Sequence, residues 1–237
     1  MHHLFGKKII LSLFVFLMAF GMTIGQSNSV DNYNYKGFQK KPYYFGLNIG
    51  INNSGYIINQ SRFFIGNDEI RIVQPASGVG LELHMIANLK LGDHFDFRFL
   101  PGFSFASRQL EFTQVGTDVT EFNNAEPVYF EMPFQVRYKS KPYKDKRVFV
   151  IGGLKYGYDV AGNSEAKQSI IKFSSHDFQW EVGLGMQFFY PYFIFSPEIK
   201  FSRGITNNLI YDNNLVPARV LENVFSQVIS ISFNFEG

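Results

Sequence analysis

Period-two alternation of apolar and polar residues extends over unusually long segments of this sequence. In residues 177–204, DFQWEVGLGMQFFYPYFIFSPEIKFSRG, apolar side chains occupy every second position, and the pattern is interrupted at Tyr190-Pro191. Because successive side chains of a β-strand point to opposite faces, this spacing predicts two strands, each with one apolar and one polar face. The chain must therefore fold so that the two faces of each strand meet different surroundings.

Six further segments repeat the pattern. They are residues 43–52, 79–90, 94–105, 128–139, 148–157 and 225–235. The sequence therefore predicts eight strands, each about 10–13 residues long, which is typical of membrane-spanning strands (about 9–11 residues) and long for a soluble protein (about 5–6).

The connections between these strands alternate in length. Short connections are expected at 91–93, 140–146 and 190–191, and long connections at 53–78, 106–126, 159–175 and 204–223. Outer-membrane barrels have short periplasmic turns and longer external loops. The sequence thus predicts an all-β fold, an eight-stranded antiparallel transmembrane β-barrel of the outer-membrane type, with both termini periplasmic and four long external loops.

Two kinds of barrel could be built from such strands. A soluble lipocalin-like barrel would turn its apolar faces inward, whereas a membrane barrel would turn them outward to lipid. The apolar faces carry about forty bulky side chains, and an eight-stranded barrel is only wide enough inside for ordinary side chains. Many of these bulky residues come from the 28 Phe of the chain. The apolar faces are therefore expected to contact outer-membrane lipid, and the polar faces to line the lumen.

The N-terminus has the pattern of a secretory signal peptide. Two lysines at 7–8 precede an apolar run over residues 9–20, which is followed by small residues. An uncleaved anchor helix is the alternative. The predicted organisation is a signal peptide over 1–25, a polar periplasmic linker over 26–41 and the transmembrane barrel over 42–237. The chain has no Cys, which excludes disulfides and a lipid-modified N-terminal cysteine.

Charged side chains on the polar faces define a candidate lumen charge network. Its members are Glu82, Lys90, Asp96, Arg98, Glu131, Arg137, Lys155, Glu181, Glu198 and Lys200, with Lys139 on the same face. The nearly balanced signs fit an ion or substrate path, but they also fit a self-neutralising plug, because buried charges persist when they are paired. We favour the plug. A tight turn at Tyr190-Pro191 that pairs Phe189 with Tyr192 would set Glu181 opposite Lys200.

No pattern in the sequence indicates catalysis, a metal site or a cofactor. His84, His94 and His176 are not at metal-ligand spacing. Ser175, His176 and Asp177 are adjacent, and they cannot form a triad because neighbouring strand side chains point to opposite faces. We therefore expect no enzyme activity. The net charge of +2 gives no electrostatic footprint for nucleic acid, and no small-molecule substrate is indicated.

Aromatic side chains gather at the predicted strand ends. The tyrosines expected to form girdles at the membrane interfaces are Tyr43, Tyr44, Tyr138, Tyr156, Tyr158, Tyr190 and Tyr192. Each of them alone could equally be hydrophobic filler. The C-terminal run VISISFNFEG resembles the targeting signal of outer-membrane barrels, although it ends in Glu236-Gly237 and not in an aromatic residue.

Several segments, in order along nearly the whole chain after the signal peptide, resemble the PorT family, also called SprT in gliding bacteria. They are KPYYFGLNIGIN (41–52), LKLGDHFDFRFLPGFSFASRQL (89–110), EMPFQVRYKSK (131–141), VIGGLKYGYD (150–159) and YFIFSPEIKFSRG (192–204). The resemblance implies a Bacteroidota outer-membrane barrel that type IX secretion requires, and gliding motility in some species. It implies no enzyme activity and no catalytic residues. Because one scaffold can serve several roles, the fold is the safer part of this expectation.

The function expected from the sequence is an accessory or assembly component of type IX secretion, located in the outer membrane. Its expected partners are outer-membrane lipid and other type IX secretion components. An eight-stranded barrel is too narrow to pass a folded protein. The alternative is an adhesion or surface-recognition barrel of the OmpA or OmpX kind that acts through its external loops, and a lipid-modifying barrel enzyme is a more distant one.

Overall fold

The computed structural model describes residues 32–66, 70–114, 120–125, 127–161, 171–211 and 219–237. The predicted signal peptide (1–25) and the start of the predicted linker (26–31) lie outside these ranges. Within them, no helix has both the length and the apolar character needed to cross a membrane. The elements are α2 (Tyr33–Gln39), β1 (Tyr43–Gln60), α3 (Arg62–Gly66), β2 (Ile70–Lys90), β3 (Phe95–Phe99), β4 (Gly102–Phe105), β5 (Arg108–Gln114), β6 (Thr120–Ala125), β7 (Val128–Lys139), β8 (Lys146–Asp159), β9 (His176–Phe189), β10 (Ile194–Gly204) and β11 (Leu221–Glu236).

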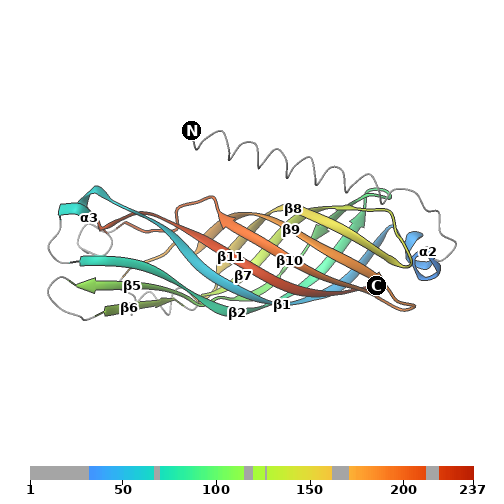
Figure 1. The fold of residues 1–237 in the computed structure, drawn as a ribbon, viewed down its shortest axis with the longest axis horizontal. Coiled ribbons are helices and arrows are strands. Elements are labelled where there is room, and N and C mark those ends of the chain that lie inside the picture. The colour runs from blue at the N-terminus through green and yellow to red at the C-terminus, as the bar shows by residue number, and fades with distance from the viewer. Residues whose placement is uncertain (1–31, 67–69, 115–119, 126, 162–170, 212–218) are drawn as a thin grey trace, which may run out of the picture.

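Eight wall positions close into an antiparallel barrel (Figure 1). Around the ring the order is β1, β2, β3 with β4, β7, β8, β9, β10 and β11, and β11 pairs with β1 to complete the closure. The segments β3 and β4 share one position, since both pair with β2 on one side and with β7 on the other. The predicted eight-stranded antiparallel barrel is therefore confirmed.

A proline accounts for the division of the third wall strand. Pro101 has no backbone N–H to donate, and it lies between β3 and β4. Phe99 pairs with Ala87 and Gly102 pairs with His84, so the register against β2 is the same on both sides of the break. The two segments therefore act as one strand of the wall.

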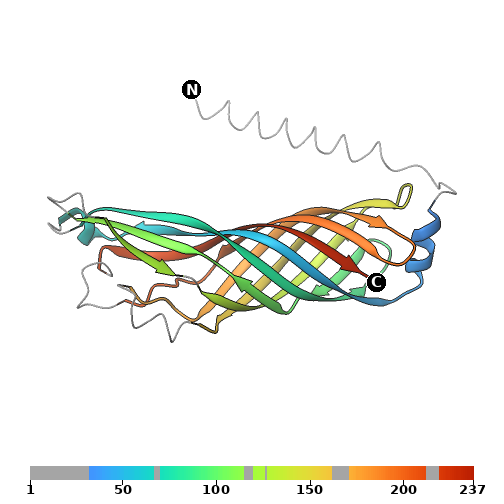
Figure 2. The same cartoon turned by 90° about the horizontal axis from the view of Figure 1, so that it is seen from below.

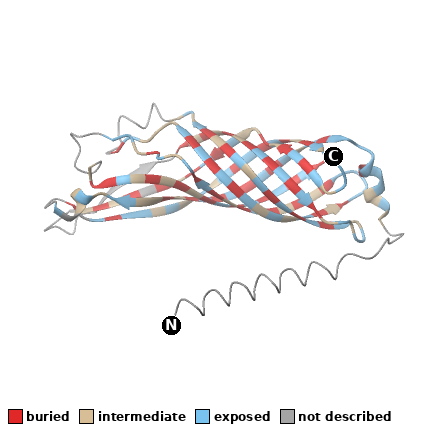
Figure 3. Cartoon of the chain, turned by 90° about the horizontal axis from the view of Figure 1, so that it is seen from above, coloured by how far each residue is buried: buried red, intermediate tan, exposed pale blue. Residues whose placement is uncertain are grey.

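Burial alternates residue by residue along the wall, as the chequered colouring of Figure 3 shows. On β9, Gln179 and Glu181 are buried, whereas Trp180 and Val182 are exposed. The outward side chains are mainly apolar, and the inward ones are mainly polar or charged, with a few inward apolar residues such as Ile86, Phe149 and Ile151. An apolar belt of this size is unfavourable in water and suits the hydrocarbon of a bilayer, where closure of the ring also satisfies the strand edges.

The two ends of the barrel differ, and we name them by their connections. At the short-turn end lie the β2–β3, β7–β8 and β9–β10 turns, and the chain also enters β1 and leaves β11 there. At the long-loop end, β1, β2, β5, β6 and the start of β11 continue beyond the rest of the wall (Figure 2). In outer-membrane barrels the short turns are periplasmic, so the long-loop end is external.

Two of the long connections expected from the sequence are largely strand. Over 53–78 and 106–126, β1 continues to Gln60, β2 begins at Ile70, and β5 and β6 form a further hairpin. Side-chain polarity is reversed here: Leu110 and Phe112 point inward and are buried, and Glu111 between them is partly exposed. The outer face at this end meets water, so the strands continue while the apolar-outward pattern stops.

The inward apolar residues of this extension form an outer cluster. It consists of Tyr56, Ile70, Val73, Leu110, Phe112, Ile171, Val220, Leu221 and Val224. Its members come from five segments that are far apart in the chain. The outer cluster therefore closes the barrel at its external end in the manner of a small soluble core.

Candidate functional site: the lumen and its short-turn mouth

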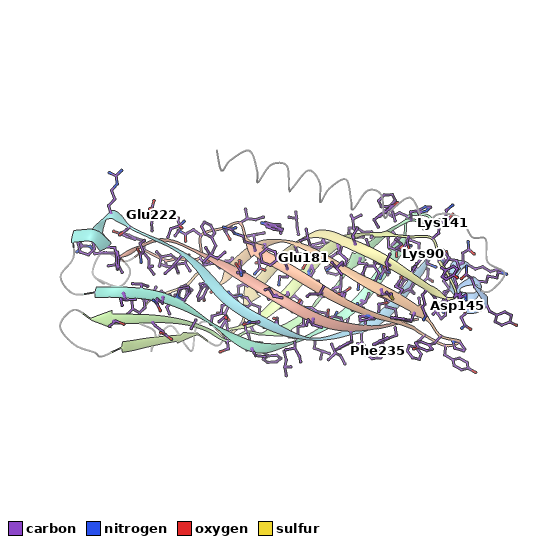
Figure 4. The ribbon with its side chains drawn as sticks, viewed as in Figure 1. Lys90, Lys141, Asp145, Glu181, Glu222 and Phe235 are labelled. Atoms are coloured by element: carbon purple, nitrogen blue, oxygen red, sulfur yellow. The ribbon has the colours of Figure 1, made fainter. Side chains whose placement is uncertain are left out.

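Nine of the ten predicted network residues are buried, and Lys90 at the short-turn end is partly exposed. Their side chains all arise from inward positions of the wall. Figure 4 shows Glu181 inside the barrel body and Lys90 near the short-turn end. The structure thus brings these residues into one lumen, where each charge depends on its neighbours for compensation.

Two ion pairs reach across the full width of the lumen. Arg98 Nη1 on β3 lies 3.0 Å from Glu198 Oε2 on β10, and Arg137 Nη1 on β7 lies 3.2 Å from Glu236 Oε1 on β11. In each pair the two strands are four positions apart in the ring of eight, so they face each other directly. Arg98 Nη2 also lies 3.4 Å from Glu236 Oε1. These side chains span the lumen at this level.

A second group surrounds Asp96 near the short-turn end. Its carboxylate accepts a hydrogen bond from Arg137 Nη2 at 2.9 Å and pairs with the Lys139 ammonium. Arg137 also donates to the hydroxyl of Tyr44 and, at 3.0 Å, to the side-chain oxygen of Asn88. One aspartate is thus flanked by two cations, which offsets the cost of burying its charge.

The middle of the lumen holds a third group around Glu131. This carboxylate accepts from Lys155 Nζ at 3.0 Å, and it lies 3.3 Å from His84 Nε2. The other ring nitrogen of His84 lies 3.2 Å from the side-chain oxygen of Asn48. A histidine held between two oxygens is a structural element of the plug, because both nitrogens are occupied.

The predicted pairing of Glu181 with Lys200 is wrong. Phe189 pairs with Ile194 and not with Tyr192, which moves the β9–β10 register by two residues and sets Glu181 opposite Ser202. Its carboxylate instead accepts from Gln135 Nε2 at 2.8 Å. The reason is the turn, which needs four residues closed by a hydrogen bond from Tyr190 N to the Phe193 carbonyl at 2.9 Å.

Lys200 has different partners from the predicted one. Its ammonium lies 3.4 Å from Glu82 Oε1 and 3.6 Å from Glu198 Oε1. Because the register differs by an even number of residues, the inward orientation of both Glu181 and Lys200 is unchanged. Only the identity of the neighbours changes.

One predicted girdle residue also lies elsewhere. Tyr44 is buried in the lumen beside Arg137, while Tyr43 is exposed on the outer face. Consecutive residues of a strand cannot both face outward. The other predicted girdle tyrosines, at 138, 156, 158, 190 and 192, are exposed or partly exposed.

Several lumen residues were missed in the sequence. They are Arg108, Arg147, Asp177 and Glu236, all of which are buried. Each occupies an inward position by parity with a recognised polar residue: Glu236, for example, follows Asn234 at a spacing of two. Asp177 already stood on the polar face of the predicted strand, whereas Arg108 lay in a predicted loop, and Arg147 and Glu236 lay just outside the predicted strand bounds.

Arg108 seals the external end of the polar lumen. Its guanidinium lies between the rings of Tyr56 and Tyr129, at 5.2 and 5.0 Å from their centroids, and donates to the Tyr129 hydroxyl at 3.3 Å. Asp177 Oδ2 lies 3.8 Å from Arg108 Nη1. Beyond this layer the lumen is occupied by the outer cluster.

Helix α2 closes the short-turn mouth, where the sequence led us to expect a polar linker (26–41). Tyr35 N donates to Asp145 Oδ1 at 2.9 Å, and Asp145 N donates to Asn32 Oδ1 at 3.1 Å. Asn32 Nδ2 donates to the Pro142 carbonyl at 3.2 Å. The helix is therefore fastened to the β7–β8 turn.

Apolar contacts hold the other side of α2 against the barrel. Phe38 is buried in a cluster with Tyr44, Phe189 and Ile194, and Tyr35 packs against it. Burial raises the pKa of the Tyr35 phenol, which therefore stays neutral. The sequence did not reveal this helix because it is too short to show periodicity. Its two apolar contact residues, Tyr35 and Phe38, are three residues apart and therefore lie on one face.

Of the adjacent Ser-His-Asp residues, Ser175 precedes β9, and His176 and Asp177 lie on opposite faces of that strand. The side chain of His176 is exposed and its Nδ1 lies 2.7 Å from the Tyr156 hydroxyl, whereas Asp177 is buried in the lumen. Among the described residues, no three His, Asp or Glu side chains gather in a way that could hold a metal ion. The arrangement in the lumen is suited to neutralising charge and blocking passage.

A family model described as "Outer membrane protein beta-barrel domain" matches residues 21–209. No curated protein matches the chain.

Solved structures of outer-membrane proteins are similar to it at low identity. OprG from Pseudomonas aeruginosa is 12% identical with a TM-score of 0.42, and the alignment covers 81% of this chain and 96% of that one. Neisserial surface protein A (NspA) is 11% identical with a TM-score of 0.43, and the alignment covers 82% of this chain and 97% of that one. Ail, the attachment invasion locus protein of Yersinia pestis, was solved in complex with the heparin analogue sucrose octasulfate. It is 13% identical with a TM-score of 0.39, and the alignment covers 83% of this chain and 100% of that one.

Proposed function

The chain belongs to the family of outer-membrane β-barrel domains, and on that premise we propose that it serves type IX protein secretion as an accessory or assembly component of the outer membrane. The similarity of five segments between residues 41 and 204 to the PorT family supports this function. Under this proposal, the partners of the barrel are other type IX components. In species that glide, gliding motility depends on it as well. No step of this function requires an enzyme activity.

The observation that carries the proposal is the closed lumen. The Arg98–Glu198 and Arg137–Glu236 pairs cross the interior, α2 covers one mouth and the outer cluster fills the other. Secreted cargo has no passage through such a barrel. Its contribution is therefore made by its ends or its outer wall, as expected for a component that supports a separate translocon.

Surface recognition is the second candidate, and one observation favours it. The β5–β6 hairpin and the outer half of β2 project beyond the barrel and are stiffened by the outer cluster (Figures 1 and 2). A projecting, ordered surface is suited to binding another molecule outside the cell. This role would need the extension, whereas a role in secretion that uses the wall or the periplasmic end would not.

The test is deletion of the gene followed by complementation with two forms of the protein. One is the natural chain, and the other replaces residues 109–124 by Asn-Gly, which joins the paired residues Arg108 and Ala125 by a short turn. Secretion cargo should accumulate in the periplasm of the deletion strain, and both forms should restore its export. A heat-dependent shift on gels confirms that the shortened form is folded.

The alternative predicts a different result. If surface recognition is the function, export is normal in the deletion strain, while attachment to surfaces is lost and only the natural chain restores it. Normal export in the deletion strain therefore overturns the proposal.

A further inference from the structure

The short-turn end carries a basic face built from two distant parts of the chain. Its exposed lysines are Lys36, Lys40 and Lys41 from α2 and its C-terminal side, and Lys141 and Lys144 from the β7–β8 turn. None of the five forms an ion pair with a described residue. At this end, Asp93 is the only described acidic residue whose side chain is exposed, since Asp145 is partly buried and Glu236 is fully buried.

The basic face is held in one arrangement. The three hydrogen bonds among Asn32, Tyr35, Pro142 and Asp145 join α2 to the β7–β8 turn across a sequence separation of 110 or more. The Lys90 ammonium donates to the Phe38 carbonyl in the last turn of the helix. A preorganised set of charges binds a complementary partner at a lower entropic cost than the same charges on a mobile linker.

Lys144 adopts an uncommon backbone conformation in the β7–β8 turn. Lys144 and Asp145 both adopt positive φ, at 49° and 57°, as in the two-residue hairpin turns that favour Asn-Gly. The positive φ of Asp145 positions its backbone N–H and carboxylate for their hydrogen bonds with Asn32 and Tyr35 of the α2 segment. Lys144 contacts only the ring of Tyr143, with its ammonium 5.6 Å from the centroid, among the interactions of the described residues. A lysine with positive φ carries a small backbone cost, and its exposed ammonium is left available to a partner.

Aromatic and apolar surface adjoins the lysines. Tyr33, the first residue of α2, is 84% exposed, and Tyr192 in the β9–β10 turn is 90% exposed. Asn34 Nδ2 donates to the Phe189 carbonyl at 3.1 Å, which places this turn beside the helix. Exposed tyrosines beside charges are typical of protein interfaces.

From these observations we propose that the basic face binds an acidic segment of a periplasmic protein, one that also carries aromatic or aliphatic side chains. Helix α2 lies beyond the strand ends, across the mouth of the barrel, so the face is directed away from the bilayer (Figures 1 and 2). Phospholipid head groups surround the outer wall instead. This inference is independent of type IX secretion, since it needs only a barrel with this end in the periplasm.

The experiment measures binding to the folded protein in nanodiscs of zwitterionic phosphatidylcholine. The probe is a fluorescent peptide in which Asp and Glu alternate with Phe and Leu, compared with an all-Glu peptide of the same length. The natural protein should bind the mixed peptide more tightly, with an affinity that falls as salt is raised. Reversal of three charges (Lys36→Glu, Lys40→Glu and Lys144→Glu) should weaken binding at least about tenfold.

A matched control reverses three exposed basic residues at the external end, Arg62→Glu, Lys172→Glu and Arg203→Glu. It should bind the mixed peptide as the natural protein does. A heat-dependent gel shift checks that all variants are folded, and Tyr33→Ala should weaken binding of the mixed peptide without affecting the all-Glu peptide.

Three outcomes overturn the proposal. The first is equal binding by the natural protein and the Lys36/Lys40/Lys144 variant. The second is equal affinity for the two peptides, which would reduce the face to a non-specific anion site. The third is weak peptide binding alongside lysine-dependent binding to anionic phosphatidylglycerol vesicles or to purified peptidoglycan, which would assign the face to one of those surfaces.

Discussion

Arg98 and Glu198 form an ion pair of 3.0 Å between strands that lie diametrically opposite in the barrel. Both side chains are buried, and each has a further charged neighbour, Glu236 for Arg98 and Lys200 for Glu198. The pair joins two strands, β3 and β10, that are not hydrogen-bonded to each other. The interior of this barrel is thus a structural core made of charges.

Loss of one member of this pair should be costly. Arg98→Met leaves the Glu198 carboxylate buried without its main partner and should lower the free energy of unfolding by about 3–5 kcal/mol. Urea unfolding in lipid vesicles measures this change. Lys141→Met, at an exposed lysine, should stay within about 0.5 kcal/mol. The double variant Arg98→Met/Glu198→Met should recover part of the loss, and strictly additive losses would contradict a coupled pair.

The partner of Glu181 can be identified by the same method. A double-mutant cycle with Gln135→Leu and Glu181→Leu should give a larger coupling energy than a cycle with Lys200→Met and Glu181→Leu. The reason is that Gln135 Nε2 donates directly to Glu181, whereas Lys200 contacts other carboxylates. A larger coupling with Lys200 would restore the register expected from the sequence and contradict the observed β9–β10 pairing.

Substitutions on the two faces of β9 should fail for different reasons. Val182→Lys places a charge on the outward face and should cost about 2–4 kcal/mol near the membrane midplane. Gly183→Phe should also destabilise, because a Cβ at Gly183 would lie 2.7 Å from the Ile199 carbonyl and 3.0 Å from Lys200 Cγ. Val182→Leu is the neutral control. A barrel that tolerates Val182→Lys but not Val182→Leu would have its faces reversed.

The lumen should not conduct ions. Single-channel recordings in planar bilayers should show no stable, large conductance for the natural protein. Removal of residues 32–41 should not open it, because the Arg98 and Arg137 pairs remain in place above the mouth. Conductance that appears only after this deletion would mean that α2 alone closes the lumen. Conductance in the natural protein would support an ion or substrate path through the barrel.

The Asp145 carboxylate is one of the contacts that attach α2 to the barrel. Asp145→Gly keeps a residue that accepts positive φ but removes the acceptor for Tyr35 N, so α2 should detach more often and trypsin should cleave faster at its lysines. Asp145→Asn retains an acceptor oxygen and should be cleaved more slowly than Asp145→Gly. Asp93→Gly, at an exposed aspartate of the same end, should not change the rate. Equal rates for the three variants would show that Asp145 does not anchor the helix.

Alternation in the sequence was sufficient to predict the strands of the membrane belt and their two faces. Val182 and Gly183 illustrate why: a strand has a period of two, so each residue's face follows from its neighbours, and lipid demands apolar side chains on one of them. The ring of eight followed from counting these segments and from the short turns between them. The predicted network residues are inward for the same reason.

The pattern failed where the surroundings changed. Leu110 and Phe112 lie in a strand whose outer face meets water, so its polarity is the reverse of that in the membrane belt. Local sequence rules that assume one environment along the whole strand read this segment as a loop. Helix α2 was missed because its stability comes from contacts with Asp145 and Phe189, more than a hundred residues away in the chain.

Tertiary structure alone decided which charges meet. Glu181 lost its predicted partner through a shift of two residues at one turn, and that shift leaves every face unchanged, so no periodicity could have revealed it. Arg98 and Glu198 are separated by 100 residues and meet only because the ring closes. A strand's sequence therefore determines which way a side chain points, while its contacts across the lumen depend on closure and register, which are properties of the whole barrel.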